Sequence, residues 1–188
     1  MSLPLTKRKK RAGAKFFGLC YNKRMNYIIR PLKESETHLL KDFTYEAIFQ
    51  RDPENLIPRD VLSQPEVRVF YEDFGKPDDL CFVAEADGAL LGAVWTRIIA
   101  GAVRGFGNLD PYTPEFAISV YGNHRGQGIG TALMRHMLEA LRERGYQRTS
   151  LAVQKDNYAV RMYEAVGFSI VRETEEEYLM VCELGVGD

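Results

Sequence analysis

Hydrophobic and polar positions follow two different periods along this chain, which predicts both helices and strands. After residue 128 the apolar residues recur at helical spacing and the charged residues lie elsewhere on the helical wheel; the apolar set is Leu133, Met134, Met137, Leu138 and Leu141. Gly145 ends this helix as a C′ residue would. Strand-like runs at 115–121 and 149–153 flank the helix, so the centre of the chain is predicted to read strand, helix, strand.

The same periods continue toward both ends of the chain. They predict a strand at 27–32, a helix at 36–49 and a short helix at 66–74. Strands at 80–85 and 89–98 flank Asp87-Gly88, a dipeptide typical of a hairpin turn. A short helix near 159–166, capped by Asp156 or Asn157, precedes two strands at 169–172 and 178–184. This order predicts one α/β domain with a mixed, mostly antiparallel sheet flanked by α-helices.

Composition adds limits to this picture. The 188 residues are 45% hydrophobic and 27% charged, as in an ordinary soluble domain, and no apolar run approaches the length of a membrane span. Cys20, Cys81 and Cys182 stand far apart, without a Cys-x-x-Cys pair. Such a scattered, odd set suits reduced thiols in a cytoplasmic protein and disfavours a disulfide framework or a zinc site.

Charge is distributed unevenly. Residues 1–24 hold eight basic residues and no acidic one, although the whole chain has a formal net charge of −1. We therefore expect a basic N-terminal extension at 1–24 and a single acidic domain at 25–188. The extension is either a solvated segment or a contact for nucleic acid or an anionic surface. We favour the solvated segment.

One glycine-rich turn carries the strongest functional signal. Between the strand at 115–121 and the helix, the chain reads Arg125-Gly126-Gln127-Gly128-Ile129-Gly130-Thr131. Glycines let the backbone turn sharply, and a helix start adds unpaired N–H groups and the positive end of the helix dipole. A strand, a glycine-rich turn and a helix start together form an anion site, most often for phosphate. The alternative is a tight turn with glycines for packing alone.

Two common phosphate motifs do not fit this turn. A P-loop requires a Lys before its final Ser/Thr, and here Gly130 stands directly before Thr131. A Rossmann fingerprint requires a third glycine where this chain has Thr131 or Leu133. The pattern Arg/Gln-x-x-Gly-x-Gly/Ala does fit, as Arg125, Gly128 and Gly130. It resembles the acetyl-CoA pyrophosphate loop of the GNAT superfamily of N-acetyltransferases.

A second stretch makes the resemblance more specific. The other half of the GNAT coenzyme site typically reads Asn-x-Ala, then Tyr-Glu, then Gly-Phe. This chain has the same sequence of residues in the same order, as Asn157, Ala159, Tyr163-Glu164 and Gly167-Phe168. The resemblance covers roughly residues 27–184, with the detailed match at 115–168.

The resemblance implies a site for acetyl-CoA as acyl-donor cosubstrate, and no metal. In the family, N–H groups of the turn bind the pyrophosphate; here these belong to Gly126, Gln127, Gly128, Ile129, Gly130 and Thr131, with Arg125 adding charge. The preceding strand splays from its neighbour and pairs with the pantetheine arm, which gives that role to Ile118, Ser119 and Val120. An N–H at or near Val120 would meet the thioester oxygen as charge develops. Asn157 either bonds the pantetheine or only caps its helix.

Two side chains are candidates for the chemistry. Tyr163 is a candidate general acid for the CoA thiolate, because a phenol with a pKa of about 10 can donate to a thiolate whose thiol lies near 8.5. The alternative for Tyr163 is a core aromatic. An acceptor amine with a pKa of roughly 8–10 must lose a proton near neutrality, and Glu115 is the candidate base. Its alternative is a solvated charge; Asp110, Tyr112 and His124 are weaker candidates.

The acceptor is the least defined part of the site. The first helices and the loop at 101–114 offer aromatic and acidic residues, which suit a polyamine, an aminoglycoside or a lysine side chain unless most of the aromatics are core. The set is Tyr45, Glu46, Phe49, Tyr71, Trp95, Asp110 and Tyr112.

Three functions remain open at this point. The intact turn and Tyr163 favour an N-acetyltransferase that moves the acetyl group of acetyl-CoA to a primary amine of a small molecule or protein, by direct attack in a ternary complex. The second is a non-catalytic acyl-CoA-binding sensor or regulatory module. The third is nucleic-acid binding through the basic extension, which the acidic domain disfavours. We expect no membrane partner; many GNAT domains pair as homodimers, and 178–184 is a candidate edge strand.

Overall fold

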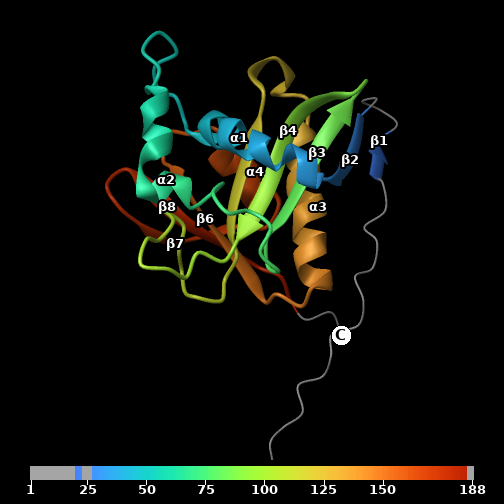
Figure 1. Ribbon diagram of the computed structural model, residues 1–188. Helices are drawn as coiled ribbons and strands as arrows, with labels where there is room; N and C mark the ends of the chain where they lie inside the picture. The colour runs from blue at the N-terminus through green and yellow to red at the C-terminus, as the bar shows by residue number, and fades with distance from the viewer. Residues whose placement is uncertain (1–19, 23–26, 186–188) are drawn as a thin grey trace, which may run out of the picture.

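An eight-stranded sheet runs through residues 20–22 and 27–185, the part of the chain that the computed structural model describes (Figure 1). Its strand order is β1-β2-β3-β4-β5-β6-β8-β7. The strands are β1 Cys20–Asn22, β2 Tyr27–Pro31, β3 Leu80–Ala86, β4 Ala89–Arg97, β5 Glu115–Val120, β6 Arg148–Gln154, β7 Ser169–Glu173 and β8 Glu177–Glu183. All neighbouring strands are antiparallel except β5 and β6. The predicted mixed, mostly antiparallel sheet is confirmed.

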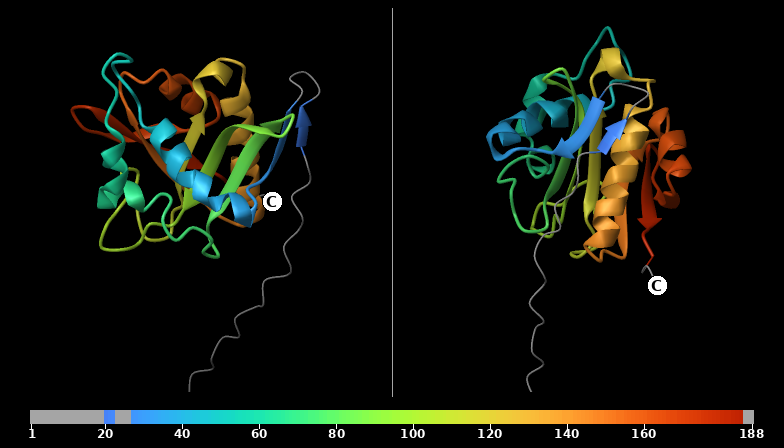
Figure 2. Two further views of the ribbon diagram at one scale, coloured as in Figure 1. Left: turned by 45° about the horizontal axis from the view of Figure 1, so that its top comes forward. Right: turned by 90° about the vertical axis from the view of Figure 1, so that its right-hand side faces the viewer.

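Helices cover both faces of this sheet. They are α1 Leu40–Ala47, α2 Pro65–Arg68, α3 Ile129–Glu143 and α4 Ala159–Ala165, with short 3-10 turns η1 Glu34–Leu39, η2 Arg59–Ser63 and η3 Gly122–His124. The views in Figure 2 place α1 and α2 on one face and α3 and α4 on the other. None of the helices in the described residues is long and apolar enough to cross a bilayer.

Side chains that alternate along the strands contribute to a separate apolar cluster on each face of the sheet. On β3, Phe82 and Ala84 pack in the cluster under α3, whereas Cys81 and Val83 pack in the cluster under α1. Successive side chains of a strand point to opposite faces, so a sheet covered on both sides needs apolar residues in both registers. On α3 the apolar stripe read from the sequence is fully buried, with Leu133 at 0% exposure.

The hairpin between β3 and β4 is confirmed at Asp87-Gly88. Both residues adopt positive φ, 50° and 80°, which is the conformation that a two-residue type I′ turn requires.

Two predicted helices are shorter in the structure than in the sequence pattern. The predicted helix at 36–49 begins as the 3-10 turn η1 and ends at Ala47, because Ile48 is extended. The predicted helix at 66–74 is regular only over α2, and Asp73 and Gly75 take positive φ, which no helix tolerates. Apolar periodicity was present in both segments, but it does not by itself set where a helix stops.

The two ends of the sheet also differ from expectation. Strand β1 lies within the segment 1–24 that was predicted as an extension, and it pairs with β2, so the sheet begins before residue 25. The basic residues of that segment lie outside the described residues. Strand β8 lies between β6 and β7, so the stretch 178–184 is not the edge strand that the sequence suggested. On that side, β7 forms the outer strand of the described sheet.

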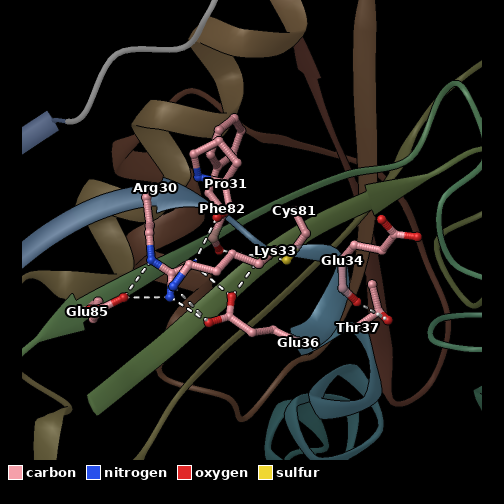
Figure 3. A network of polar contacts seen from close by, with 9 residues as sticks. All are labelled: Arg30, Pro31, Lys33, Glu34, Glu36, Thr37, Cys81, Phe82 and Glu85. Atoms are coloured by element: carbon pink, nitrogen blue, oxygen red, sulfur yellow. Dashed lines mark hydrogen bonds and ion pairs between the residues drawn. The ribbon is translucent and has the colours of Figure 1, made fainter. Parts of the chain in front are cut away.

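Arg30 ties β2, the second strand of the sheet, to β3 and η1 (Figure 3). Its guanidinium donates two hydrogen bonds to Glu36, both at 2.8 Å, and its Nε donates to Glu85 on β3 at 2.5 Å. The Glu36 carboxylate also accepts the Lys33 N–H at the start of η1. The Arg30 contact lowers the pKa of Glu36 to about 2. This cluster therefore fixes η1 against β2 through paired charges.

A second arginine holds the segment after α2. Arg97, at the end of β4, pairs with Asp79 at 3.1 Å, and both side chains are almost fully buried. Its NH groups also bond the carbonyl oxygens of Val69, Glu72 and Asp73. One guanidinium thereby satisfies three backbone carbonyls of a segment that lacks regular helical bonds.

Candidate active site

The sheet opens between β5 and β6. Within the ladder, these parallel strands are registered at Glu115 and Ser150 alone, beside the bond from the Ser150 N–H to the Pro114 carbonyl. Beyond that point each strand keeps its other neighbour, β4 or β8, while the two diverge. The predicted splay of the strand before the turn is thus present as a seam in the sheet.

Backbone amides of β5 face this seam. The Tyr121 N–H bonds the Leu91 carbonyl of β4, and hydrogen-bonded pairs alternate along an antiparallel ladder. Ile118 and Val120 are therefore in the positions whose N–H groups point away from β4, toward the seam. Ser119, in the other register, is bonded to β4 through its backbone and has a buried hydroxyl.

The glycine-rich turn lies at one end of the seam. Gly126 and Gly128 take positive φ, 73° and 79°, where a side chain would be strained. The first helical bond of α3 runs from the Ala132 N–H to the Gly128 carbonyl, which leaves the N–H groups of Ile129, Gly130 and Thr131 outside the helical ladder. This is the geometry of an anion site at a helix N-terminus.

Side chains around the turn have more specific places than the sequence indicated. Arg125 bonds the Val120 carbonyl through Nε at 2.7 Å and lies 3.7 Å from the Glu46 carboxylate. Gln127 donates to the Asn123 carbonyl and braces the turn from outside. The side chain of Ile129 is buried in the core, so its backbone alone faces a ligand. The side-chain oxygen of Asn157 accepts the Ala159 N–H at the start of α4.

A cavity of about 420 Å³ lies against the turn, and we call it the turn cavity. Every residue predicted to bind the cofactor lines it except Gln127. The lining also includes Met162 and Tyr158 of the α4 region and Ala47 to Gln50 at the end of α1, which the motif did not mark. A smaller cavity of about 220 Å³, the carboxylate cavity, contains Glu115.

The two cavities meet at Tyr163. Ala47, Ile48, Phe49, Ile118 and Tyr163 line both of them. Tyr163 is 8% exposed and packs near Phe168, and burial raises the pKa of its phenol. A raised pKa keeps this hydroxyl protonated, which suits a hydrogen-bond donor. The two predicted catalytic residues, Tyr163 and Glu115, therefore both line the carboxylate cavity, which lies next to the turn cavity.

Glu115 is not a solvated charge at a strand end. Its side chain is 3% exposed, and Oε1 accepts the Gly107 N–H at 2.6 Å. Oε2 is buried without a hydrogen-bond partner among the described residues. Burial raises the pKa of Glu115 to about 7, and the Gly107 bond opposes this shift only in part. A carboxyl poised near neutrality can both accept and release a proton at physiological pH.

The loop before β5 makes room for this carboxylate. A Cβ at Gly105 would collide with the carboxyl group of Glu115, and a Cβ at Gly107 would lie 2.7 Å from the backbone of Leu151. Both glycines are therefore required for the loop to close over the Glu115 side chain. The sequence marked this loop as glycine-rich and as a candidate segment for the acceptor, but it did not indicate that the loop covers Glu115.

The weaker candidates for the base lie elsewhere. Asp110 pairs with Arg148 at 2.7 Å and accepts bonds from Tyr112 and Thr113, which together lower its pKa. Tyr112 is 80% exposed and lines neither cavity, and His124 lines the turn cavity. Neither Asp110 nor Tyr112 reaches the space around Glu115.

The aromatic set proposed for the acceptor divides in the structure. Phe49 and Trp95 line the carboxylate cavity, and the Trp95 indole donates to the Phe70 carbonyl at 3.0 Å. Tyr45 and Tyr71 are outside both linings, with their hydroxyls bonded to the Ile57 and Leu62 carbonyls.

Comparison with known proteins agrees with this geometry. The model of the acetyltransferase (GNAT) family matches residues 43–168, more than half of the chain. The chain belongs to the GNAT acetyltransferase family. The matched range runs from α1 through the turn and α4, and it includes both cavities' shared residues.

Individual relatives of this GNAT chain are distant. A mycothiol acetyltransferase of Thermobispora bispora is 38% identical over 89 residues, which are 47% of this chain and 29% of that protein. The chain thus spans about a third of the length of the mycothiol acetyltransferases that it matches. An N-alpha-acetyltransferase of Sulfurisphaera tokodaii is 29% identical over 151 residues, 71% of this chain and 88% of that protein.

Solved structures share the fold of this GNAT domain. YncA, a putative acetyltransferase from Salmonella typhimurium solved with acetyl-CoA, superposes with a TM-score of 0.62 at 17% identity, over 85% of this chain and 95% of the other. PaiA N-acetyltransferase from Thermoplasma acidophilum, in complex with coenzyme A, gives 0.61 at 17% identity, over 85% and 99%.

Proposed function

We propose that this GNAT protein transfers the acetyl group of acetyl-CoA to a primary amine by direct attack in a ternary complex. The observation that carries the proposal is the buried Glu115 carboxyl, with its pKa at about 7, in a cavity that shares Tyr163 with the turn cavity. A module that only binds acyl-CoA has no need for a buried, unpaired carboxylate beside the seam. Burying such a group costs stability, so its presence favours catalysis.

Acetyl-CoA fits the turn cavity by its chemistry. The diphosphate would accept from the N–H groups at the start of α3, and its negative charge would meet the positive end of the helix dipole. The pantetheine arm would run along β5, where the N–H groups of Ile118 and Val120 face the seam. The Val120 N–H is the candidate donor to the thioester oxygen as negative charge develops there, a role typically worth a few kcal/mol.

Glu115 would then prepare the amine. An ammonium ion cannot attack, so it first gives a proton to the Glu115 carboxylate. The neutral nitrogen forms a bond to the thioester carbon, and the C–S bond breaks as the amide forms. Glu115 releases the first proton to solvent and, as a carboxylate again, takes the second nitrogen proton as the amide forms. The sulfur leaves as thiolate and takes a proton from the Tyr163 hydroxyl, which is reprotonated from solvent.

The test is acetyl-CoA-dependent thiol release over a panel of amines, with calorimetric binding of acetyl-CoA alongside it. We expect amine-dependent release, and we expect Tyr163→Phe to lower kcat by roughly 100-fold, at the low end of the effect of a general acid. The affinity for acetyl-CoA should change little. Binding of acetyl-CoA without turnover of any amine would favour the sensor instead. Full kcat in Tyr163→Phe would remove Tyr163 from the mechanism.

A further inference from the structure

We infer that the carboxylate cavity selects a small primary monoamine with an apolar or aromatic body, and that it rejects polyamines and free amino acids. The inference rests on the proposed function, because such an amine must reach Glu115 to react. It narrows the acceptor class from the broad set of cationic amines that the sequence alone suggested.

The walls of the cavity are mostly apolar. Aromatic rings come from several elements, as Phe49, Phe70, Trp95, Phe106, Phe116 and Tyr163. Phe70 and Phe106 stack with their ring centroids 6.2 Å apart and their planes at 9°. Phe106 is 54% exposed, so its ring stands where the cavity meets solvent. Burial of an apolar ligand body in a pocket with such walls is favourable, whereas burial of several ammonium groups is not.

The size of the cavity limits what enters. Its volume of about 220 Å³ lies below the roughly 300–1,000 Å³ of sites for drug-sized ligands. An aminoglycoside would not fit within it. A four-carbon alkylamine or a phenylethylamine is of the size that a cavity of this kind encloses.

The charges that line the cavity decide between amines. Among the described lining residues, the carboxylates are Glu115 and Glu177, and there is no Lys, Arg or His. Glu115 is registered with Ser150 and Glu177 with Gln154, so their backbone positions are about 13 Å apart along β6 at the usual rise per residue. A short diamine held at Glu115 would leave its second ammonium among apolar side chains, where an unpaired charge is disfavoured. A substrate carboxylate would find no cation.

Rigid support makes these walls a defined shape. Trp95 holds the Phe70 carbonyl, and Arg97 holds the carbonyls of Val69, Glu72 and Asp73. The segment that carries Val67 and Phe70 is thus fastened to β4 on both sides of the Phe70 ring. A wall fixed in this way discriminates by shape and charge, because it cannot rearrange to supply a new polar partner.

Matched acceptors test the selectivity. Butylamine and 1,4-diaminobutane differ by the second amine, and 2-phenylethylamine and phenylalanine differ by the carboxylate. We expect kcat/KM to favour the monoamine of each pair by roughly 30-fold or more, because the extra charge must be buried without a partner. Trp95 is the sole tryptophan of the chain and lines this cavity, so its fluorescence reports binding without turnover. On enzyme saturated with coenzyme A, the monoamines should alter Trp95 emission and the charged analogues should not.

Variants at the cavity rim sharpen the test. Phe106→Glu places a carboxylate beside the second ammonium and should narrow the gap between butylamine and 1,4-diaminobutane by roughly 10-fold, a change of about 1.4 kcal/mol. Phe106→Leu, which loses the ring without gaining charge, is the matched control and should keep the gap. Glu177→Gln should also leave the gap unchanged, because Glu177 lies four residues farther along β6 than Glu115 does.

The outcomes separate this inference from the proposed function. The selectivity would be overturned if diamines or polyamines turned over faster than monoamines in a reaction that depends on Glu115, or if a preference for diamines were abolished by Glu177→Gln. Either result would leave the N-acetyltransferase function intact. A Trp95 response to monoamines without thiol release would remove the enzymatic function and keep the selectivity of the cavity. If no amine produces either a Trp95 response or thiol release, both the selectivity and the enzymatic function are overturned.

Discussion

Glu115→Gln separates the stability cost of a buried carboxyl from its catalytic use. The substitution keeps the shape of the side chain and leaves an oxygen that can accept the Gly107 N–H, but it removes the ionisable group. In the wild type, burial raises the pKa of Glu115 from 4.5 to about 7. The folded state therefore binds this proton more tightly than the unfolded state does.

The sign of the pH dependence follows from that shift. The contribution of the Glu115 proton to stability is fully present below pH 4.5 and is lost as pH rises through 7. At about 1.36 kcal/mol per pKa unit, the loss amounts to roughly 3 kcal/mol between the two limits. The free energy of unfolding of the wild type should therefore fall by up to that amount, relative to Glu115→Gln, between pH 4.5 and pH 8.

Activity should move in the opposite direction over the same range. The wild-type kcat/KM should rise with an acidic limb near pH 7 as Glu115 ionises. Glu115→Gln should lose that limb and roughly 100- to 10,000-fold of kcat/KM at pH 8, the usual range for a general base. Urea unfolding at a series of pH values and pH–rate profiles measure the two effects on the same preparations.

A matched control is Glu175→Gln, which removes an exposed carboxylate of the β7–β8 turn. It should follow the wild type in both measurements. Parallel unfolding curves for the wild type and Glu115→Gln at every pH would show that the carboxyl is not destabilised by burial. An unchanged acidic limb in Glu115→Gln would exclude it as the base.

Three further predictions concern the turn and the two arginine clusters. Thr131→Glu adds a negative charge in the first turn of α3, which should stabilise the helix by about 0.3–1 kcal/mol. The same charge should weaken acetyl-CoA binding by at least roughly 10-fold. Equal affinity of Thr131→Glu and of its control Thr131→Gln for acetyl-CoA, measured by calorimetry, would argue against the anion site. Asp79→Asn leaves the buried Arg97 without its carboxylate and should lower the free energy of unfolding by about 3 kcal/mol or more in urea titrations, whereas the exposed Asp60→Asn should not. Because the pKa of Glu36 falls from 4.5 to about 2, its stabilising effect is present above pH 4.5 and lost as pH falls through 2. Glu36→Gln should lower the free energy of unfolding by about 1–2 kcal/mol at pH 7, after allowance for solvent screening, and by little at pH 2. An equal loss of stability at both pH values would contradict the ion pair as its source.

Local patterns explain why the turn could be found in the sequence. The positive φ of Gly128, the stripe of α3 and the hairpin at Asp87-Gly88 each depend on residues within a few positions of one another. Such features follow from backbone sterics and periodicity, which a single sequence records directly. The order of elements and the family resemblance followed from the same short segments.

Features that depend on contacts between distant segments could not be predicted from these local patterns. Whether Glu115 was solvated or buried depended on Gly105 and Gly107 closing over it. The place of β8 between β6 and β7 depended on pairing, since either strand has the composition of an edge. Arg30 and Arg97 looked like ordinary strand residues, because Glu85 and Asp79, with which they pair, lie 55 and 18 positions away along the chain. The carboxylate cavity is lined by residues from Thr44 to Glu177, so it too depends on contacts between distant segments.

The most direct test of the account is a crystal structure of the protein with acetyl-CoA. The diphosphate oxygens should lie within about 2.7–3.2 Å of backbone nitrogens at the start of α3, and the thioester oxygen should face the Val120 N–H beside Tyr163. The thioester carbon should be accessible from the Glu115 side of the seam. A nucleotide bound away from residues 126–131, or a thioester pointing out of the seam, would contradict the central claim that this turn aims acetyl-CoA into the open sheet.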